Sequence, residues 1–182
     1  MGKPQVDISV DDETGRWSVD GLPMILVPQH FYLNNHFAVE AAMGPEALER
    51  ILRPAGHRSA YYWCEKEAAY HGLSGVEVFR HYMRRITQRG WGQFDVLELS
   101  PETGSATVRL RNSAMVDDER RRTHRKVCYM FAAWLEGSLE YVAASSGHPM
   151  KLRAREVYCA AEGHHDHCQF SCEPVSAEAA SG

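Results

Sequence analysis

The alternation of apolar and polar residues along this chain changes period several times, and each change predicts a new element. Residues 5–27 alternate short apolar runs with turn residues, a pattern typical of a leading strand or hairpin and a second strand that ends at Pro28. Helical spacing follows over residues 29–52, with a break at residues 43–45. The Pro-Ala-Gly sequence at residues 54–56 is expected to end that element.

Two further helices are predicted before the period changes again. Residues 57–71 are typical of a helix that is rich in aromatic side chains, and glycines interrupt the pattern after it. Ser74 and Glu77 match a capping box, which predicts the start of a helix that runs to about Gln88. Its apolar residues recur at helical spacing, so one face of this helix is expected to be buried.

A period of two then predicts strands at residues 94–99 and 106–111. The turn between them contains Pro and Gly, which is typical of a β-hairpin. The longest helix is predicted over residues 119–144, with Cys128 on its apolar face.

Two strands, at residues 150–158 and 168–172, complete the predicted fold. The class is α+β, an antiparallel sheet with helices packed on one side. We expect a single domain over residues 1–174, in which residues 1–28 form an N-terminal extension. The small, polar tail at residues 175–182 is expected to be disordered.

Length, charge and cysteine count restrict the class of protein to which the chain can belong. A chain of 182 residues suits one domain, and a net charge of −4 argues against nucleic-acid or membrane-surface binding, which favour a basic surplus. No apolar run reaches the ~20 residues of a membrane span. The start of the chain lacks the apolar core of a secretory signal, so a cytoplasmic location is expected. Five cysteines without an export signal favour free thiols over a disulfide framework.

The chemistry of the chain is concentrated in residues 155–172. This stretch holds three of the five cysteines, three of the ten histidines and three carboxylates. Thiolate, imidazole and carboxylate groups are the ligands that zinc takes in proteins. We interpret the stretch as a metal-binding knuckle at the end of a ligand-binding domain. The alternative is that Cys159 and Cys168 are buried as small apolar side chains or as a reduced pair.

Several segments form a wider pattern, in this order: Leu52-Arg-Pro-Ala-Gly56, Arg89-Gly-Trp-Gly-Gln-Phe94, Val127-Cys-Tyr-Met-Phe131 with Gly137, Glu156-x-x-Cys159 with Gly163, and Cys168-x-Phe170. With these segments the chain resembles the 4-vinyl reductase domain family over residues 52–172. Members of that family include the aromatic-sensing domains of phenol- and xylene-responsive transcription activators.

The resemblance implies a fold of the NO-signalling and Golgi-transport ligand-binding type, often a homodimer. In the aromatic sensors a zinc ion is held by a helix cysteine, the Glu of the Glu-x-x-Cys pair and two cysteines around the glycine loop. The matching residues here are Cys128, Glu156, Cys159 and Cys168. A closed set of four protein ligands implies a structural ion with no open position for water, which points away from hydrolysis.

Strand geometry adds conditions to this ligand set. Glu156 and Cys159 would face opposite sides of a regular strand, so a shared metal requires the strand to bulge or end by Tyr158. Gly163 would supply a positive φ in the loop that follows. Cys172 lies roughly 13 Å along a strand from the nearest proposed ligand, so we interpret it as a core cysteine.

Three alternatives to this ligand set stay open. A histidine of the loop, His164, His165 or His167, can replace one of the proposed ligands. Cys128 can be a core cysteine of its helix. The metal can be iron instead of zinc.

Aromatic residues indicate where a ligand would bind. The candidates for a pocket between the helices and the sheet are Tyr62, Trp63, Trp91, Phe94, Tyr129 and Trp134. His81 joins them, because it lies in the region where sensors of the resembling family place a polar residue that contacts the ligand. For each of these residues the alternative is ordinary core packing.

We therefore expect a stand-alone, sensor-like domain that binds a small hydrophobic or aromatic molecule and contains structural zinc. An enzyme or enzyme accessory of a small-molecule catabolic or biosynthetic pathway, reductase-like and using the same pocket, is the alternative. No phosphate loop, nucleophile elbow or dinucleotide fingerprint accompanies it in the sequence. A third hypothesis is a dimerisation module whose pocket is filled by side chains.

Overall fold

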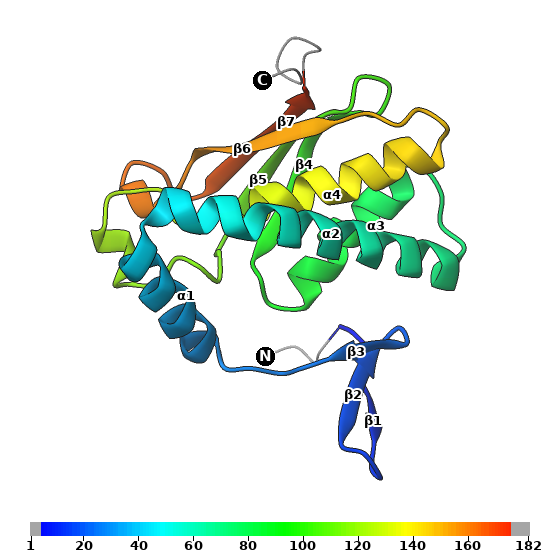
Figure 1. Ribbon diagram of the computed structural model, residues 1–182, viewed down its shortest axis with the longest axis horizontal. Coiled ribbons are helices and arrows are strands. Elements are labelled where there is room, and N and C mark those ends of the chain that lie inside the picture. The colour runs from blue at the N-terminus through cyan, green and yellow to red at the C-terminus, as the bar shows by residue number, and fades with distance from the viewer. Residues whose placement is uncertain (1–4, 176–182) are drawn as a thin grey trace.

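A four-stranded antiparallel sheet, covered on one face by helices, forms the body of the protein (Figure 1). The computed structural model describes residues 5–175. The strand order is β4-β5-β7-β6, so the predicted hairpin lies beside the C-terminal pair. The strands are β4 (Gln93–Ser100), β5 (Ser105–Arg111), β6 (Leu152–Tyr158) and β7 (Cys168–Pro174). The predicted α+β class, with helices on one side of the sheet, is confirmed.

A small three-stranded antiparallel sheet precedes the body and extends away from it in Figure 1. Its strands are β1 (Ser9–Asp11), β2 (Arg16–Val19) and β3 (Leu22–Met24). The last strand ends at Met24, earlier than the predicted end at Pro28. The apolar residues that follow form a linker to the first helix, in which Ile25 and Leu26 are 82% and 77% exposed.

The break predicted at residues 43–45 is confirmed. Helix α1 (Gln29–Met43) and helix α2 (Pro45–His71) are separated by Gly44, whose φ is 86°. Glycine tolerates this conformation, whereas a side chain there would be strained.

The predicted helix end at residues 54–56 is wrong, because α2 continues through Pro54 and is 27 residues long. A proline inside a helix costs about 3 kcal/mol or more, so tertiary contacts must outweigh this penalty. They are made with α4 (Met130–Ser145). At Gly56 the two helices approach so closely that a Cβ would lie 3.0 Å from Cδ1 of Trp134. The Pro-Ala-Gly sequence therefore marks a helix contact.

The long helix predicted over residues 119–144 is wrong over residues 119–129. Residues 117–126 are so rich in charge that a helix there would lack an apolar face to pack on the sheet. They form a loop with a short 3-10 turn, η1 (Arg120–Arg122), and His124 has a φ of 53°, which does not fit a right-handed helix. Helix α4 begins only after this loop.

Helix α3 (Val76–Gln88) ends where the sequence predicts, but the capping box at its start does not form. The N-cap position is Gly75, with a φ of 56°, and no side chain caps the helix. Glu77 instead accepts a hydrogen bond of 2.8 Å from Arg80, one turn further along.

Helix α4 lies between α2 and the sheet, and is buried on nearly every side (Figure 1). Two of its glutamates face strand β6, which is at the edge of the sheet. The Ala154 amide donates to Glu136 at 2.8 Å, and the Leu152 amide donates to Glu140 at 2.9 Å. An edge strand exposes unpaired N–H groups, and here the helix satisfies two of them.

The C-terminal strand is followed by Val175, whose amide donates to the carbonyl of Lys151 at 2.9 Å. The rest of the tail predicted to be disordered, residues 176–182, lies outside the described residues. Between residues 5 and 175 no helix combines the length and the apolar character needed to cross a membrane.

Replacing Gly137 with alanine should destabilise the protein. A Cβ at this position of α4 would collide with the backbone of His57 in α2, lying 2.9 Å from its carbonyl carbon. We expect the free energy of unfolding to fall by about 2 kcal/mol, the middle of the range for overpacked sites, as measured by urea denaturation. Gly56→Ala is the matched control, because the Trp134 side chain that it meets can move, and its loss should be smaller. An unchanged Gly137→Ala midpoint would contradict the close contact.

Candidate functional site

Three cysteines and one glutamate meet at the end of the sheet where β6 and β7 join. Cys128 precedes α4 by two residues, Glu156 is in β6, Cys159 follows β6, and Cys168 begins β7. Their ligand atoms all lie within 4.8 Å of one another. All four side chains are buried, and the three cysteines are fully so. These are the four residues that the sequence assigns to a metal, although Cys128 lies in a loop and not on the predicted helix face.

The geometric conditions for this ligand set are met. The pairing of β6 with β7 is irregular between Glu156 and Tyr158, which is the predicted bulge. A short 3-10 turn, η2 (Ala160–Glu162), follows, and Gly163 after it has a φ of 86°. The bulge turns Glu156 and Cys159 toward the same centre.

The distances within the cluster match a tetrahedral thiolate site. The Sγ atom of Cys159 lies 3.9 Å from that of Cys128 and 3.5 Å from that of Cys168. The remaining pair of sulfur atoms is 3.6 Å apart. Zinc–sulfur bonds of ~2.3 Å at tetrahedral angles place the sulfur atoms about 3.8 Å apart. The cluster can therefore bind a metal ion with little rearrangement.

The carboxylate of Glu156 also fits a metal ligand. Its Oε2 accepts a hydrogen bond of 3.1 Å from the Cys128 amide, while its Oε1 is buried without a partner among the described residues. A buried carboxylate oxygen without a partner is costly. A bound cation beside the three sulfur atoms would satisfy it.

The pKa values of the cluster also favour a bound cation. Burial, and next the neighbouring Cys159, raise the pKa of Glu156 to about 10. Burial also raises the pKa of the Cys128 thiol. Hydrogen bonds with the Cys128 and Cys159 thiols lower the pKa of Cys168 to about 5. A divalent cation would let the groups whose pKa is raised release their protons.

The rival ligands lie outside the cluster. His164 and His165 are exposed, the His165 ring stacks on Tyr158 at 4.1 Å, and His167 contacts the Tyr158 hydroxyl at 3.0 Å. Cys172 is buried on β7, where it pairs with Ala106 of β5, and belongs to the core as predicted.

The predicted ligand-contacting residues do not line one common pocket. Three of them pack edge to face around Phe131: Phe94 at 5.4 Å, Trp134 at 5.0 Å and Trp91 at 6.0 Å between ring centres. Phe94 is buried in this cluster. Tyr62 is 54% exposed on the surface of α2.

Trp63 and His81 belong to a second, partly buried cluster, which the sequence pattern did not indicate. The ligand atoms of Glu67, His71 and His81 approach within 4.8 Å of one another. Glu67 is fully buried, and its Oε2 lies 2.7 Å from Nε2 of His81. Trp63 stacks on the His81 ring at 5.7 Å. The spacing of Glu67 and His71, one helical turn apart, is the signal that could have indicated it.

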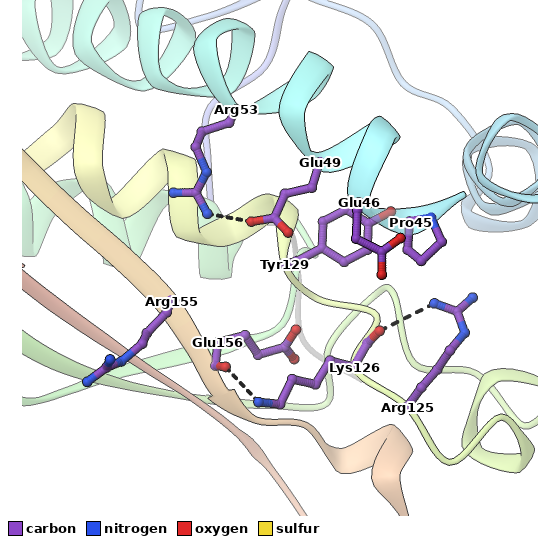
Figure 2. A pocket seen from close by; sticks show the side chains of 9 residues that line it. All are labelled: Pro45, Glu46, Glu49, Arg53, Arg125, Lys126, Tyr129, Arg155 and Glu156. Carbon is purple, nitrogen blue, oxygen red and sulfur yellow. Dashed lines mark hydrogen bonds and ion pairs between the residues drawn. The ribbon is translucent and has the colours of Figure 1, made fainter. Parts of the chain in front are cut away.

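Tyr129 lines a different cavity, beside the sulfur cluster. This cavity has a volume of about 380 Å³, and Figure 2 shows Arg53 and Glu49 of α2 on one side and Lys126 and Glu156 on the other. Two of its charged groups have partners within the lining: Arg53 binds Glu49, and Lys126 donates to the backbone carbonyl of Glu156 at 3.1 Å. The lining combines charged side chains with the apolar surface of Pro45 and Tyr129.

A cavity of about 320 Å³ with a mixed apolar and polar lining lies where the linker after β3 passes the turn between α3 and β4. Trp91 forms part of its wall, and Tyr32 of α1 meets the Trp91 ring edge to face at 5.3 Å. Other residues of the wall are Met24, Leu26, Arg89 and Ala114. Of the predicted ligand-contacting residues, only Trp91 lines it.

Two solved structures share this fold. One is the phenol-responsive sensory domain of the transcription activator PoxR with phenol, with a TM-score of 0.69 and 17% identity over 92% of this chain and 84% of that chain. The other is a trafficking protein particle complex subunit 3 from Naegleria fowleri covalently bound to palmitic acid. Its TM-score is 0.55, with 11% identity over 81% of this chain and 95% of that chain. At these identities the likeness concerns the fold alone.

Sequence comparison gives a family. A family model described as a domain of unknown function, DUF5943, matches residues 2–97, and the chain belongs to that family. A search of curated proteins gives no match. The resemblance to the 4-vinyl reductase domain family stays a prediction, which the structural likeness to a phenol-sensing domain supports in part.

Proposed function

We propose that this member of the DUF5943 family is a sensor-like domain that binds a small hydrophobic or aromatic molecule and is stabilised by structural zinc. The observation that carries the proposal is the partly apolar cavity of about 320 Å³ beside Trp91. A cavity of this size lies within the range of ~300–1000 Å³ typical of small-molecule sites. Likeness in fold to a phenol-responsive sensory domain supports the same function.

The sulfur cluster supports zinc as the resident ion. Three thiolates and one carboxylate in tetrahedral arrangement are a donor set that zinc accepts readily. Four protein ligands leave no position for a water molecule, so the ion would have a structural role. Five free cysteines, three of them in contact without a disulfide, support a reducing compartment such as the cytoplasm.

Zinc content is the first test of this proposal. Purified wild-type protein should contain one zinc ion per chain, measured by plasma mass spectrometry. Cys159→Ser should lose most of it, because a serine hydroxyl is a poor replacement for thiolate. Cys172→Ser is the control, since this buried cysteine lies outside the cluster. Full zinc content in Cys159→Ser, or none in the wild type, would contradict the metal site.

Ligand binding is tested with phenol and benzyl alcohol as probes. Saturation-transfer NMR should detect both with the wild-type protein. Ala114→Leu should weaken binding at least ~10-fold, because its larger side chain fills the cavity. Ala55→Leu, on the exposed face of α2, should bind as the wild type does. Equal binding by all three proteins would place the ligand elsewhere, and no binding by the wild type would refute the proposed function.

A homodimer is part of the same proposal. The linker after β3 exposes Ile25 and Leu26 almost fully, and exposed apolar segments of this kind mark contact surfaces. We expect Ile25→Asp to shift the protein from dimer to monomer in light scattering. Ile51→Asp, at an isoleucine of α2 that is 56% exposed, should remain dimeric. A monomeric wild type would contradict the dimer.

A further inference from the structure

Charged residues gather under the cavity beside Trp91, where α2, α3 and the tip between β2 and β3 meet. Asp20 pairs with Arg85 at 2.8 Å, and Glu67 lies 2.7 Å from His81 and 3.4 Å from His71. Each carboxylate of this group has an ionic partner on one oxygen, but Oε1 of Glu67 is buried without a hydrogen-bond partner among the described residues.

Arg89 belongs to the same group. Its Nε and Nη2 atoms are buried without a hydrogen-bond partner among the described residues, and the guanidinium lies 4.8 Å from the centre of the Trp63 ring. Burial lowers the pKa of Arg89, while the charges of Glu67 and Asp20 oppose that shift. A cation–π contact recovers only part of the hydration that a guanidinium loses on burial.

The same arginine borders the cavity beside Trp91. It is the only charged residue among those that line it, and Trp91, Tyr32 and Leu26 contribute apolar surface. One cation without a partner beside an apolar wall resembles the usual design of a small-molecule site, in which a few polar groups orient a largely apolar ligand. A metal cation bound near Glu67 would be repelled by the positive charges of Arg85 and Arg89.

We propose that this cavity binds a hydrophobic monocarboxylate, an acid of about one aromatic ring, with its carboxylate on Arg89 and its apolar body against Trp91. The inference rests on the proposed function and names the ligand class for the same cavity. Guanidinium and carboxylate form charge-assisted hydrogen bonds, often two in parallel, which are about twice as strong as neutral ones. Among the residues that line the cavity, Arg89 is the group that a carboxylate would meet.

The test compares benzoate with benzamide, an uncharged molecule of the same shape, by isothermal titration calorimetry. The wild type should bind benzoate at least ~10-fold more tightly than benzamide. Arg89→Met should abolish this preference and leave benzamide affinity within about threefold. Arg84→Met, an exposed arginine on the same helix, is the matched control and should keep the preference.

Each outcome separates this inference from the proposed function. Benzamide or phenol binding as tightly as benzoate would overturn the carboxylate and leave a neutral aromatic ligand. Failure of every probe would overturn both. If Arg89→Met does not fold, NMR of the wild-type protein provides the test. The Nε–H resonance of Arg89 should shift on addition of benzoate but not of acetate, which lacks the apolar body. An unmoved resonance would overturn the assignment.

Discussion

The fold depends on helix α4 being held between α2 and the sheet without freedom to slide. At Gly137 the backbone of α2 passes so close that only a hydrogen atom fits. On the other side Glu136 and Glu140 accept the N–H groups of the edge strand β6. Hydrogen bonds to ionised carboxylates are stronger than those between neutral groups. A shift of α4 by one turn would break both bonds and move Gly137 away from the contact, so the register of α4 against β6 is fixed.

This register assembles the metal cluster. Cys128 lies just before α4 and Glu156 lies near the end of β6, so the two meet only when helix and strand are aligned. The Cys128 amide then donates to Glu156, and the Phe131 amide donates to the Cys128 carbonyl, which ties the loop to the first turn of the helix. Cys159 and Cys168, on either side of η2, do not depend on this alignment, because the bulge and Gly163 bring them together locally.

Local signals explain which parts of the structure could be predicted from the sequence. The strands follow from a period of two, and the turn at Gly163 follows from the need for a positive φ. The helix end predicted at Pro54 was wrong because the contacts that keep the helix intact there come from α4, more than 70 residues further along the chain. The charged residues 117–126 were predicted to be helical because a sequence pattern does not show which surface a helix would pack against. Glu67 was missed because its partner His81 comes from another helix, and one turn of α2 alone is a weak signal.

Phe131 connects the sulfur cluster to the cavity beside Trp91. Its amide is bonded to Cys128, and its ring meets Trp91, which forms part of the cavity wall. Protein interiors are packed as densely as organic crystals, so a displaced side chain moves its neighbours. In the proposed function, an ion bound at Cys128 would also hold Phe131, and through it the position of the Trp91 ring. The ion would then contribute to ligand binding without touching the ligand, because it would keep the wall of the cavity in the shape that an aromatic ring requires.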